Sequence, residues 1–281
     1  MRGFGIAGSV TFMGIVAVNA MGFIDHDTRS GMGCGANWPL CNGSVIPSFS
    51  NEAVIIEYVH RLLTLVFVSA LVMFLFGAFK KHRQFGALKR LTWVLITLLL
   101  IETVICTAGV LWNVPAPIMA CLAPIGLAAQ GILWVMIRTP LTDPSSNARA
   151  DANISARIMN LIGILSLAYL YIGAWESYIS PAHPSLVAVY LVSGILLALA
   201  VLFWIGSRAR TGKGRGYGLW PLVAAPFVSS FESRTVAGDL AIYIWLSWCT
   251  AVVIYYLLDP RVQEGTIEFR HRRPVPSKSP Q

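Results

Sequence analysis

Two residues near the start of the second apolar run have types and spacing that could do chemistry. Glu57 and His60 lie three residues apart in the segment EYVHRLL, so on a helix they share one face. A carboxylate can hold or move a proton, and an imidazole is the usual axial ligand of haem iron. Ionisable groups within an apolar helix are costly, which favours a functional role. A structural alternative stays open: Glu57 and Arg61 could anchor the helix at the interface, with His60 simply hydrogen-bonded nearby.

Two cysteines precede this pair in the glycine-rich loop GMGCGANWPLCNG. In an oxidising compartment, a disulfide between Cys34 and Cys41 would close a small ring, a stabilisation of about 2–3 kcal/mol. The pattern fits a structural disulfide or a redox-exchanging pair. It does not favour a zinc site, because zinc takes four ligands and only His26 lies nearby. The other cysteines lie within apolar runs and are interpreted as small core residues: Cys106, Cys121 and Cys249.

The elements that must position these residues are membrane spans. Hydrophobic residues make up 56% of the 281, charged residues 12%, and the mean hydropathy is +0.66. Soluble domains carry about a quarter charged residues, so a soluble globular fold is excluded. The sequence therefore predicts an all-α polytopic membrane protein with eight transmembrane helices as two four-helix halves. The expected spans are 3–24, 54–79, 91–112, 117–137, 158–176, 185–206, 217–231 and 236–258.

The predicted domain boundaries follow the polar segments. An N-terminal half covers 1–137, with an outer loop at 25–53, and a C-terminal half covers 158–258. Between them, 138–157 is polar and rich in turn formers, as a linker would be. Residues 259–281 are expected to form a cytoplasmic tail.

Two spans have alternatives. Pro221 and Pro226 interrupt the short run 217–231, so a seven-helix arrangement with a re-entrant segment is the alternative to eight spans. The first run is interpreted as a span because it exceeds the usual apolar length of a signal sequence; cleavage is its alternative.

The basic residues predict the orientation. With both termini cytoplasmic, all but three of the 21 Lys and Arg lie on the inner side, and the exceptions are Arg29, Arg61 and Arg234. Cytoplasmic loops retain Lys and Arg, so we expect a multi-pass protein of the inner or plasma membrane with both termini cytoplasmic and the cysteine loop outside. Nucleic-acid binding is not favoured, because no basic face with interleaved aromatic residues occurs.

The stretch SGMGCGANWPLCNGSVIP followed by EYVHRLL resembles the first outer loop and second helix of the haem A synthase family. The resemblance is close over 30–63 and loose over the rest. It implies an eight-helix membrane enzyme that oxidises the C8 methyl group of haem O to a formyl group, making haem A for terminal oxidases. By this resemblance His60 would bind the iron of the substrate haem, and Glu57 would handle protons or stabilise a cationic intermediate. Cys34 and Cys41 would form the family's outer-loop disulfide.

The first half departs from the family at one expected ligand. The family uses four histidines, on its second, fourth, sixth and eighth helices, and here only His60 matches closely. Leu122 stands at the position on the fourth span, and leucine cannot bind iron. Met119 and Cys121 are the sulfur-bearing residues close enough in sequence to substitute.

The second half departs further. His183 approximates the ligand position on the sixth span, but Pro184 follows directly, so a capping or loop role fits equally well. The eighth predicted span has no histidine. The second half therefore lacks the family's means of holding a haem b, and enzymatic activity is left undecided by the sequence.

Three functions are weighed. The first is a haem-modifying oxidoreductase with haem O or haem A as substrate or product. The second is a non-catalytic relative acting as a cytochrome oxidase assembly factor or a membrane subunit of a respiratory complex. A transporter is the third, and Glu102, Gln130 and Asn160 are too few and scattered for an ion path. The partners to test are the lipid bilayer, haem, haem O synthase, cytochrome oxidase or another respiratory complex, and a second copy of the chain.

Overall fold

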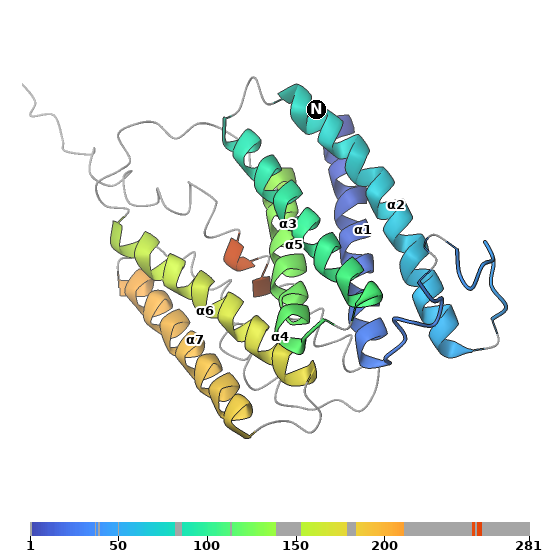
Figure 1. Cartoon of the computed structure of the whole chain (residues 1–281). Coiled ribbons are helices and arrows are strands. Elements are labelled where there is room, and N and C mark those ends of the chain that lie inside the picture. The colour runs from blue at the N-terminus through green and yellow to red at the C-terminus, as the bar shows by residue number, and fades with distance from the viewer. Residues whose placement is uncertain are drawn as a thin grey trace, which may run out of the picture.

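The computed structural model describes residues 2–36, 38, 40–49, 51–81, 86–112, 114–138, 153–178, 184–210, 249–250 and 252–254. In these ranges the named elements are all helices, and the only β pairing is an isolated bridge between Cys41 and Ser44. The helices, shown in Figure 1, are α1 (Arg2–Asp27), α2 (Glu52–Lys81), α3 (Gly86–Leu111), α4 (Ala116–Met119), α5 (Leu122–Arg138), α6 (Asn153–Tyr178) and α7 (Pro184–Arg210).

Among the described residues, five segments are long and apolar enough to cross a membrane: Phe4–His26, Glu52–Lys80, Leu88–Leu111, Ala116–Ile137 and Pro184–Ile205. In α6 the apolar stretch Asn160–Trp175 is shorter. Large apolar side chains such as Phe76, Trp93 and Phe203 point outward, as lipid contact requires. These features support a polytopic membrane protein.

The predicted count of eight spans remains a prediction. The seventh span, 217–231, lies outside the described residues, and so does most of 236–258. The same is true of the tail at 259–281 and of 139–152 in the expected linker.

Two helices extend beyond the spans predicted from the sequence. Helix α1 continues to Asp27, so His26 lies in its last turn. Helix α6 begins at Asn153, so the end of the expected 138–157 linker is helical. In both cases polar residues extend the helix beyond the apolar run that hydropathy detects.

The fourth predicted span, 117–137, is not one continuous helix, because a turn divides it. Helix α4 ends at Met119, Ala120 and Cys121 form a turn, and α5 begins at Leu122. Pro124 supplies no N–H for the carbonyl of Ala120 four residues earlier, so one helical hydrogen bond is missing at the break. The break lies directly before Leu122, where the family resemblance placed a ligand.

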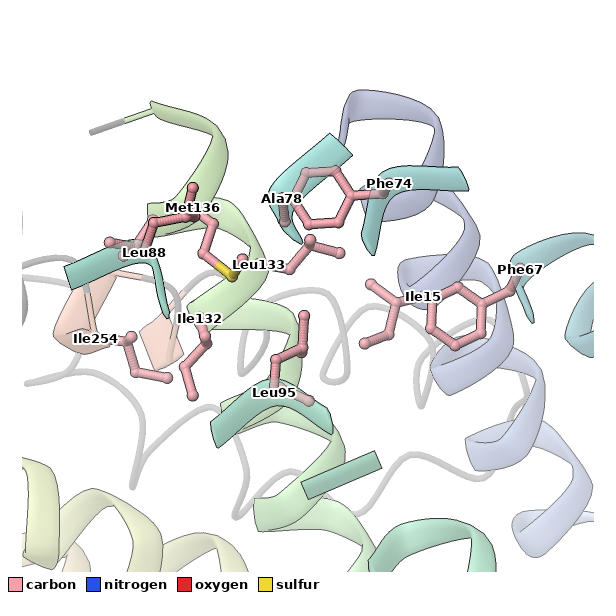
Figure 2. Packing of buried hydrophobic residues seen from close by; sticks show 12 residues of the cluster. Ile15, Phe67, Phe74, Ala78, Leu88, Leu95, Ile132, Leu133, Met136 and Ile254 are labelled. Atoms are coloured by element: carbon pink, nitrogen blue, oxygen red, sulfur yellow. The ribbon is translucent and has the colours of Figure 1, made fainter. Parts of the chain in front are cut away.

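The largest core joins four of the first five helices. Buried residues from α1, α2, α3 and α5 pack together, among them Ile15, Phe74, Leu95 and Leu133 (Figure 2). Ile254 belongs to the same cluster, beside Ile132 in the figure. The predicted last span therefore packs against the N-terminal half through Ile254.

A second core joins α6 and α7. The rings of Tyr169 and Tyr190 stack with centroids 4.7 Å apart, and the Tyr190 hydroxyl donates a hydrogen bond of 2.7 Å to the Tyr169 hydroxyl. Cys249 and Val253 pack into this second core. Residues 249–250 and 252–254 thus touch both groups of helices, and in Figure 1 they lie between α5 and α6.

Candidate functional site

The loop between α1 and α2 folds back over the start of α2. Cys34 and Cys41 form a disulfide with Cα atoms 4.3 Å apart, and both residues are fully buried. The chain turns at Gly35, Asn42 and Gly43, which have positive φ values of 68°, 51° and 81°. Glycine adopts this region without strain and asparagine tolerates it, so these residue types suit the reversals that close the ring.

Gly33 brings the loop against the backbone of α2. A Cβ at this position would overlap the carbonyl of Ala53 and lie 2.8 Å from the backbone nitrogen of Val54. Only glycine permits so close an approach of two backbones. The sulfur of Cys34 lies 3.8 Å from the Val54 carbonyl oxygen, a packing contact because a disulfide sulfur carries no proton.

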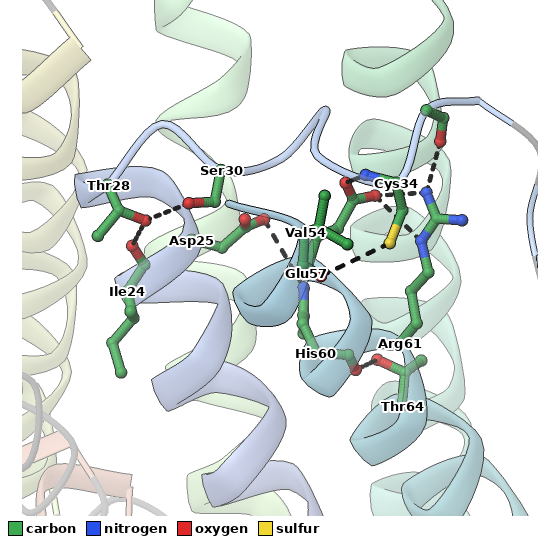
Figure 3. A network of polar contacts seen from close by, with 11 residues as sticks. Ile24, Asp25, Thr28, Ser30, Cys34, Val54, Glu57, His60, Arg61 and Thr64 are labelled. Atoms are coloured by element: carbon green, nitrogen blue, oxygen red, sulfur yellow. Dashed lines mark hydrogen bonds and ion pairs between the residues drawn. The ribbon is translucent and has the colours of Figure 1, made fainter. Parts of the chain in front are cut away.

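A buried ion pair fastens the disulfide ring to α2. Glu57 and Arg61 are both buried, and the Arg61 Nε donates to Glu57 Oε1 at 3.0 Å, with Nη2 bound to the same oxygen. The other carboxylate oxygen, Oε2, accepts the backbone N–H of Cys34 at 2.6 Å. Arg61 also donates to the carbonyls of Gly35 and Leu40, both at 2.6 Å. Figure 3 shows this pair beneath the loop.

The bonds of Glu57 define what its carboxylate does in this arrangement. One oxygen accepts hydrogen bonds from a guanidinium and the other accepts one from a backbone N–H. Arg61 contacts the ring beside each cysteine, through Gly35 and Leu40. The pair therefore holds the loop against α2.

His60 has different partners from Glu57. Its Nδ1 lies 3.8 Å from Asp25 Oδ2 of α1, within ion-pair range but beyond a hydrogen bond (Figure 3). Its Nε2 faces the same helix, since a Cβ placed at Gly22 would lie 3.6 Å from that atom. The ring is 21% exposed and the Asp25 side chain 15%. The imidazole thus lies between α1 and α2, not toward lipid.

Asp25 is a site residue that the sequence did not single out. It was placed in the outer loop, whereas it lies in α1 one turn after Gly22. Its Oδ1 is buried and has no hydrogen-bond partner in the described part of the chain. In the sequence, Asp25 is visible only as an acid three residues after Gly22, at the end of an apolar run. This spacing indicates a site only when His60 is known to face the same side of α1.

The sulfur residues of the broken fourth span have contacts of their own. The thiol of Cys121 donates to the Pro117 carbonyl at 3.6 Å. The thioether of Met119 packs at Gly109 of α3, where a Cβ would lie 2.8 Å from the sulfur. These contacts give no support for either residue as a substitute ligand opposite His60.

The remaining histidines add little to the site. His183, predicted as a second ligand, lies outside the described residues, as do His82 and His271. Helix α7 begins at Pro184. Among the described residues, no three or more His, Cys, Asp or Glu side chains gather as a metal-ion site.

Comparisons with known proteins give one consistent answer. No family model matches the chain. A curated relative from Bacillus licheniformis named "Heme A synthase" is 28% identical over 185 residues, covering 64% of this chain and 59% of that protein. Proteins of the same name from Alkalihalophilus pseudofirmus and Lysinibacillus sphaericus are 29% and 33% identical, covering 47% and 40% of this chain and 44% and 36% of their own lengths. The chain thus spans about half the length of the curated relatives it matches.

Proposed function

Because the chain is related to the haem A synthase family, we propose that it is a haem A synthase-like membrane protein. The proposed reaction is oxidation of the C8 methyl group of haem O to a formyl group, for terminal oxidase biogenesis. The observation that carries the proposal is His60, an imidazole enclosed between two membrane helices with a carboxylate at its Nδ1. Histidines that ligate metals commonly have such a carboxylate at the second ring nitrogen.

In this proposal His60 binds the iron of the substrate haem through Nε2. The negative Asp25 side chain, 3.8 Å from Nδ1, would favour the tautomer with its proton on Nδ1, which leaves the lone pair of Nε2 for the metal. The haem supplies the methyl carbon that is oxidised, and the protein supplies orientation. His183 is the proposed second haem-binding residue.

Room beside His60 limits how haem can bind. A methyl group at Gly22 would already be in van der Waals contact with the ring, 3.6 Å from Nε2. A porphyrin needs more space than a methyl group, so loading requires the imidazole to turn or α1 to move away. The glycine makes that opening easier, because no side chain of α1 has to be displaced from this position.

Glu57 contributes as the proposed essential carboxylate. Its ion pair with Arg61 and its bond to Cys34 fix the loop above His60, so we assign its first role to positioning. A proton-handling role requires Oε2 to leave the Cys34 N–H during turnover.

The proposed placement is the inner or plasma membrane, with the loop outside and both termini cytoplasmic. Described basic residues gather at the helix ends remote from the loop, among them Lys80, Lys89, Arg138 and Arg208. This asymmetry supports the orientation, since Lys and Arg are retained in the cytoplasm. The proposed protein partners are haem O synthase and cytochrome oxidase or another respiratory complex.

The experiment is co-expression with a haem O synthase in a host without haem A, followed by pyridine haemochrome spectra of the purified protein. Wild type is compared with His60→Ala, and His26→Ala is the control for a histidine at the same end of the bundle. We expect haem A with wild type and His26→Ala, and none with His60→Ala. Wild-type protein that contains no haem contradicts the proposal.

A second function is favoured by the fourth span. Leu122 occupies the expected ligand position, and the thiol of Cys121 already donates to a backbone carbonyl. A relative with one haem ligand would bind haem O without oxidising it, as an assembly factor. In the same experiment this function gives bound haem O, no haem A, and co-purification with a respiratory complex.

A further inference from the structure

A second group of polar side chains meets inside the first helical group, away from the disulfide loop. Asn19 of α1 donates from Nδ2 to Gln130 Oε1 of α5 at 3.4 Å. Glu102 of α3 meets them at Gly126, where a Cβ would lie 2.7 Å from Glu102 Oε1 and 3.2 Å from Asn19 Oδ1. We call Asn19, Glu102 and Gln130 the interior polar cluster. Glu102 and Gln130, which looked scattered in the sequence, therefore lie together in the fold. Asn160, the third polar residue of that set, is exposed on α6.

The cluster lies close to His60 along α1. Asn19 precedes Gly22 by three residues, and Gly22 faces the imidazole. At 1.5 Å per residue the cluster is about 4.5 Å deeper in the bundle than His60. Asp25, Gly22 and Asn19 follow one another at a spacing of three and so share one face of α1.

No cation balances Glu102. In the part of the chain that the structure describes, Glu102 has no ion pair, and Arg61 is bound to Glu57 and two loop carbonyls. An ionised carboxylate within a membrane helix is costly without a partner. A protonated carboxyl removes this cost and gains a donor, and amide oxygens such as Asn19 Oδ1 can accept it.

The other titratable groups near the cluster lie on the neighbouring turns. On α1, Asp25 shares the face that carries Asn19, and on α3 the thiol of Cys106 lies one turn from Glu102. On α2, the facing titratable groups are His60, held by Asp25, and Arg61, held by Glu57. The cluster member on α5, Gln130, is uncharged. Adding another negative charge here is opposed by those already present.

From this arrangement we propose that the interior polar cluster is a proton-binding site. Glu102 carries the proton near neutral pH, and Asn19 and Gln130 form its amide lining. Because Gly126 has no side chain, the Glu102 carboxyl can lie beside Asn19. The site is separate from the haem proposal and stands whether or not His60 binds haem.

The test is infrared spectroscopy of the purified full-length protein in the carbonyl-stretch region of protonated carboxyl groups, near neutral pH. Wild type is compared with Glu102→Gln, and Glu52→Gln is the control because Glu52 is exposed at the start of α2. We expect a band, shifted by deuterium oxide, in wild type and the control but not in Glu102→Gln. Identical spectra for wild type and Glu102→Gln overturn the proposal.

Two further arms keep the result specific. Gly126→Ala places a methyl group against the end of the flexible Glu102 side chain, so the protein should fold and the band should shift. An unshifted band would mean that the Glu102 carboxyl does not lie beside Gly126, which overturns the proposed geometry. Gly5→Ala, where a Cβ meets nothing within 4 Å, is its control. Spectra in sodium and choline buffers should agree. A band that appears only without sodium would mean that the carboxylate holds a cation, which also overturns the proposal.

Discussion

At the scale of single residues, two side chains one helical turn apart have different roles. Glu57 and His60 share a face of α2, yet Glu57 binds Arg61 and the loop while His60 meets Asp25. The acid that interacts with the imidazole is therefore Asp25, which comes from α1. Two variants separate these roles.

Asp25→Asn should weaken haem binding at His60 by about 10–100-fold, the usual cost of losing a partner behind a metal ligand. The neutral amide no longer favours the tautomer with its proton on Nδ1. Haem titration of purified protein measures the affinity, and the absorption spectrum of the bound haem reports the altered ligand. Glu52→Gln is the charge control, and equal affinities for wild type and Asp25→Asn would remove Asp25 from the site.

Arg61→Met should destabilise the protein by about 3–5 kcal/mol, because it leaves the buried carboxylate of Glu57 without its cation. It also removes the donors to Gly35 and Leu40. Thermal unfolding in detergent measures the loss. Adding Glu57→Gln should recover part of it, since a neutral amide needs no counter-charge and still accepts the Cys34 N–H. If Arg61→Met unfolds like wild type, the ion pair does not hold the loop.

At the scale of elements, the loop is stable because it docks on α2, not because of the disulfide alone. Gly33 sets this contact, since any side chain there meets the backbone of Ala53 and Val54. Both sulfurs are buried only while the loop is docked.

Gly33→Ala should therefore undock the loop and expose the disulfide. We expect reduction by a mild water-soluble reductant to become about tenfold faster, equivalent to ~1.4 kcal/mol of docking energy. Thiol labelling over time measures the rate. Gly5→Ala, made in open space on α1, should react like wild type. An unchanged rate in Gly33→Ala would show that the close approach at Ala53 is not needed.

At the scale of the whole molecule, the loop and the basic helix ends lie at opposite ends of the bundle. Helix α2 joins them: its 30 residues span about 45 Å, more than the roughly 30 Å of hydrocarbon in a bilayer. The orientation can be tested at its two ends.

Glu52→Cys and Lys80→Cys place one new thiol at each end of α2, and both positions are exposed. In intact cells, a membrane-impermeant maleimide should label Glu52→Cys and leave Lys80→Cys unlabelled until the membrane is opened. The parent protein gives the background from Cys106 and Cys121. The reverse labelling pattern would place the loop in the cytoplasm.

The sequence predicted the parts of this structure that depend on local composition. Apolar runs locate α2, α3 and α7 to within a few residues, because hydropathy is summed along the chain. It also singled out Glu57, His60 and the two cysteines, which lie close together in sequence. The prolines of the fourth span could have indicated its break, but its hydropathy suggested one continuous helix.

The remaining features depend on contacts between distant residues. Asn19 and Gln130 are 111 positions apart, and nothing local to either indicates that they meet Glu102. Asp25 was assigned to a loop because charge ends an apolar run, although the helix continues. Such pairings follow from how helices pack, which composition does not determine.

Arg61 donates hydrogen bonds on both sides of the disulfide ring, and this has a consequence for how the protein matures. Glu57 and Arg61 bind one another, but the remaining guanidinium donors and the second carboxylate oxygen find their partners in the loop. A chain whose loop has not yet folded over α2 would leave these groups unpaired in a membrane helix, and we expect such an immature form to be sensitive to proteases.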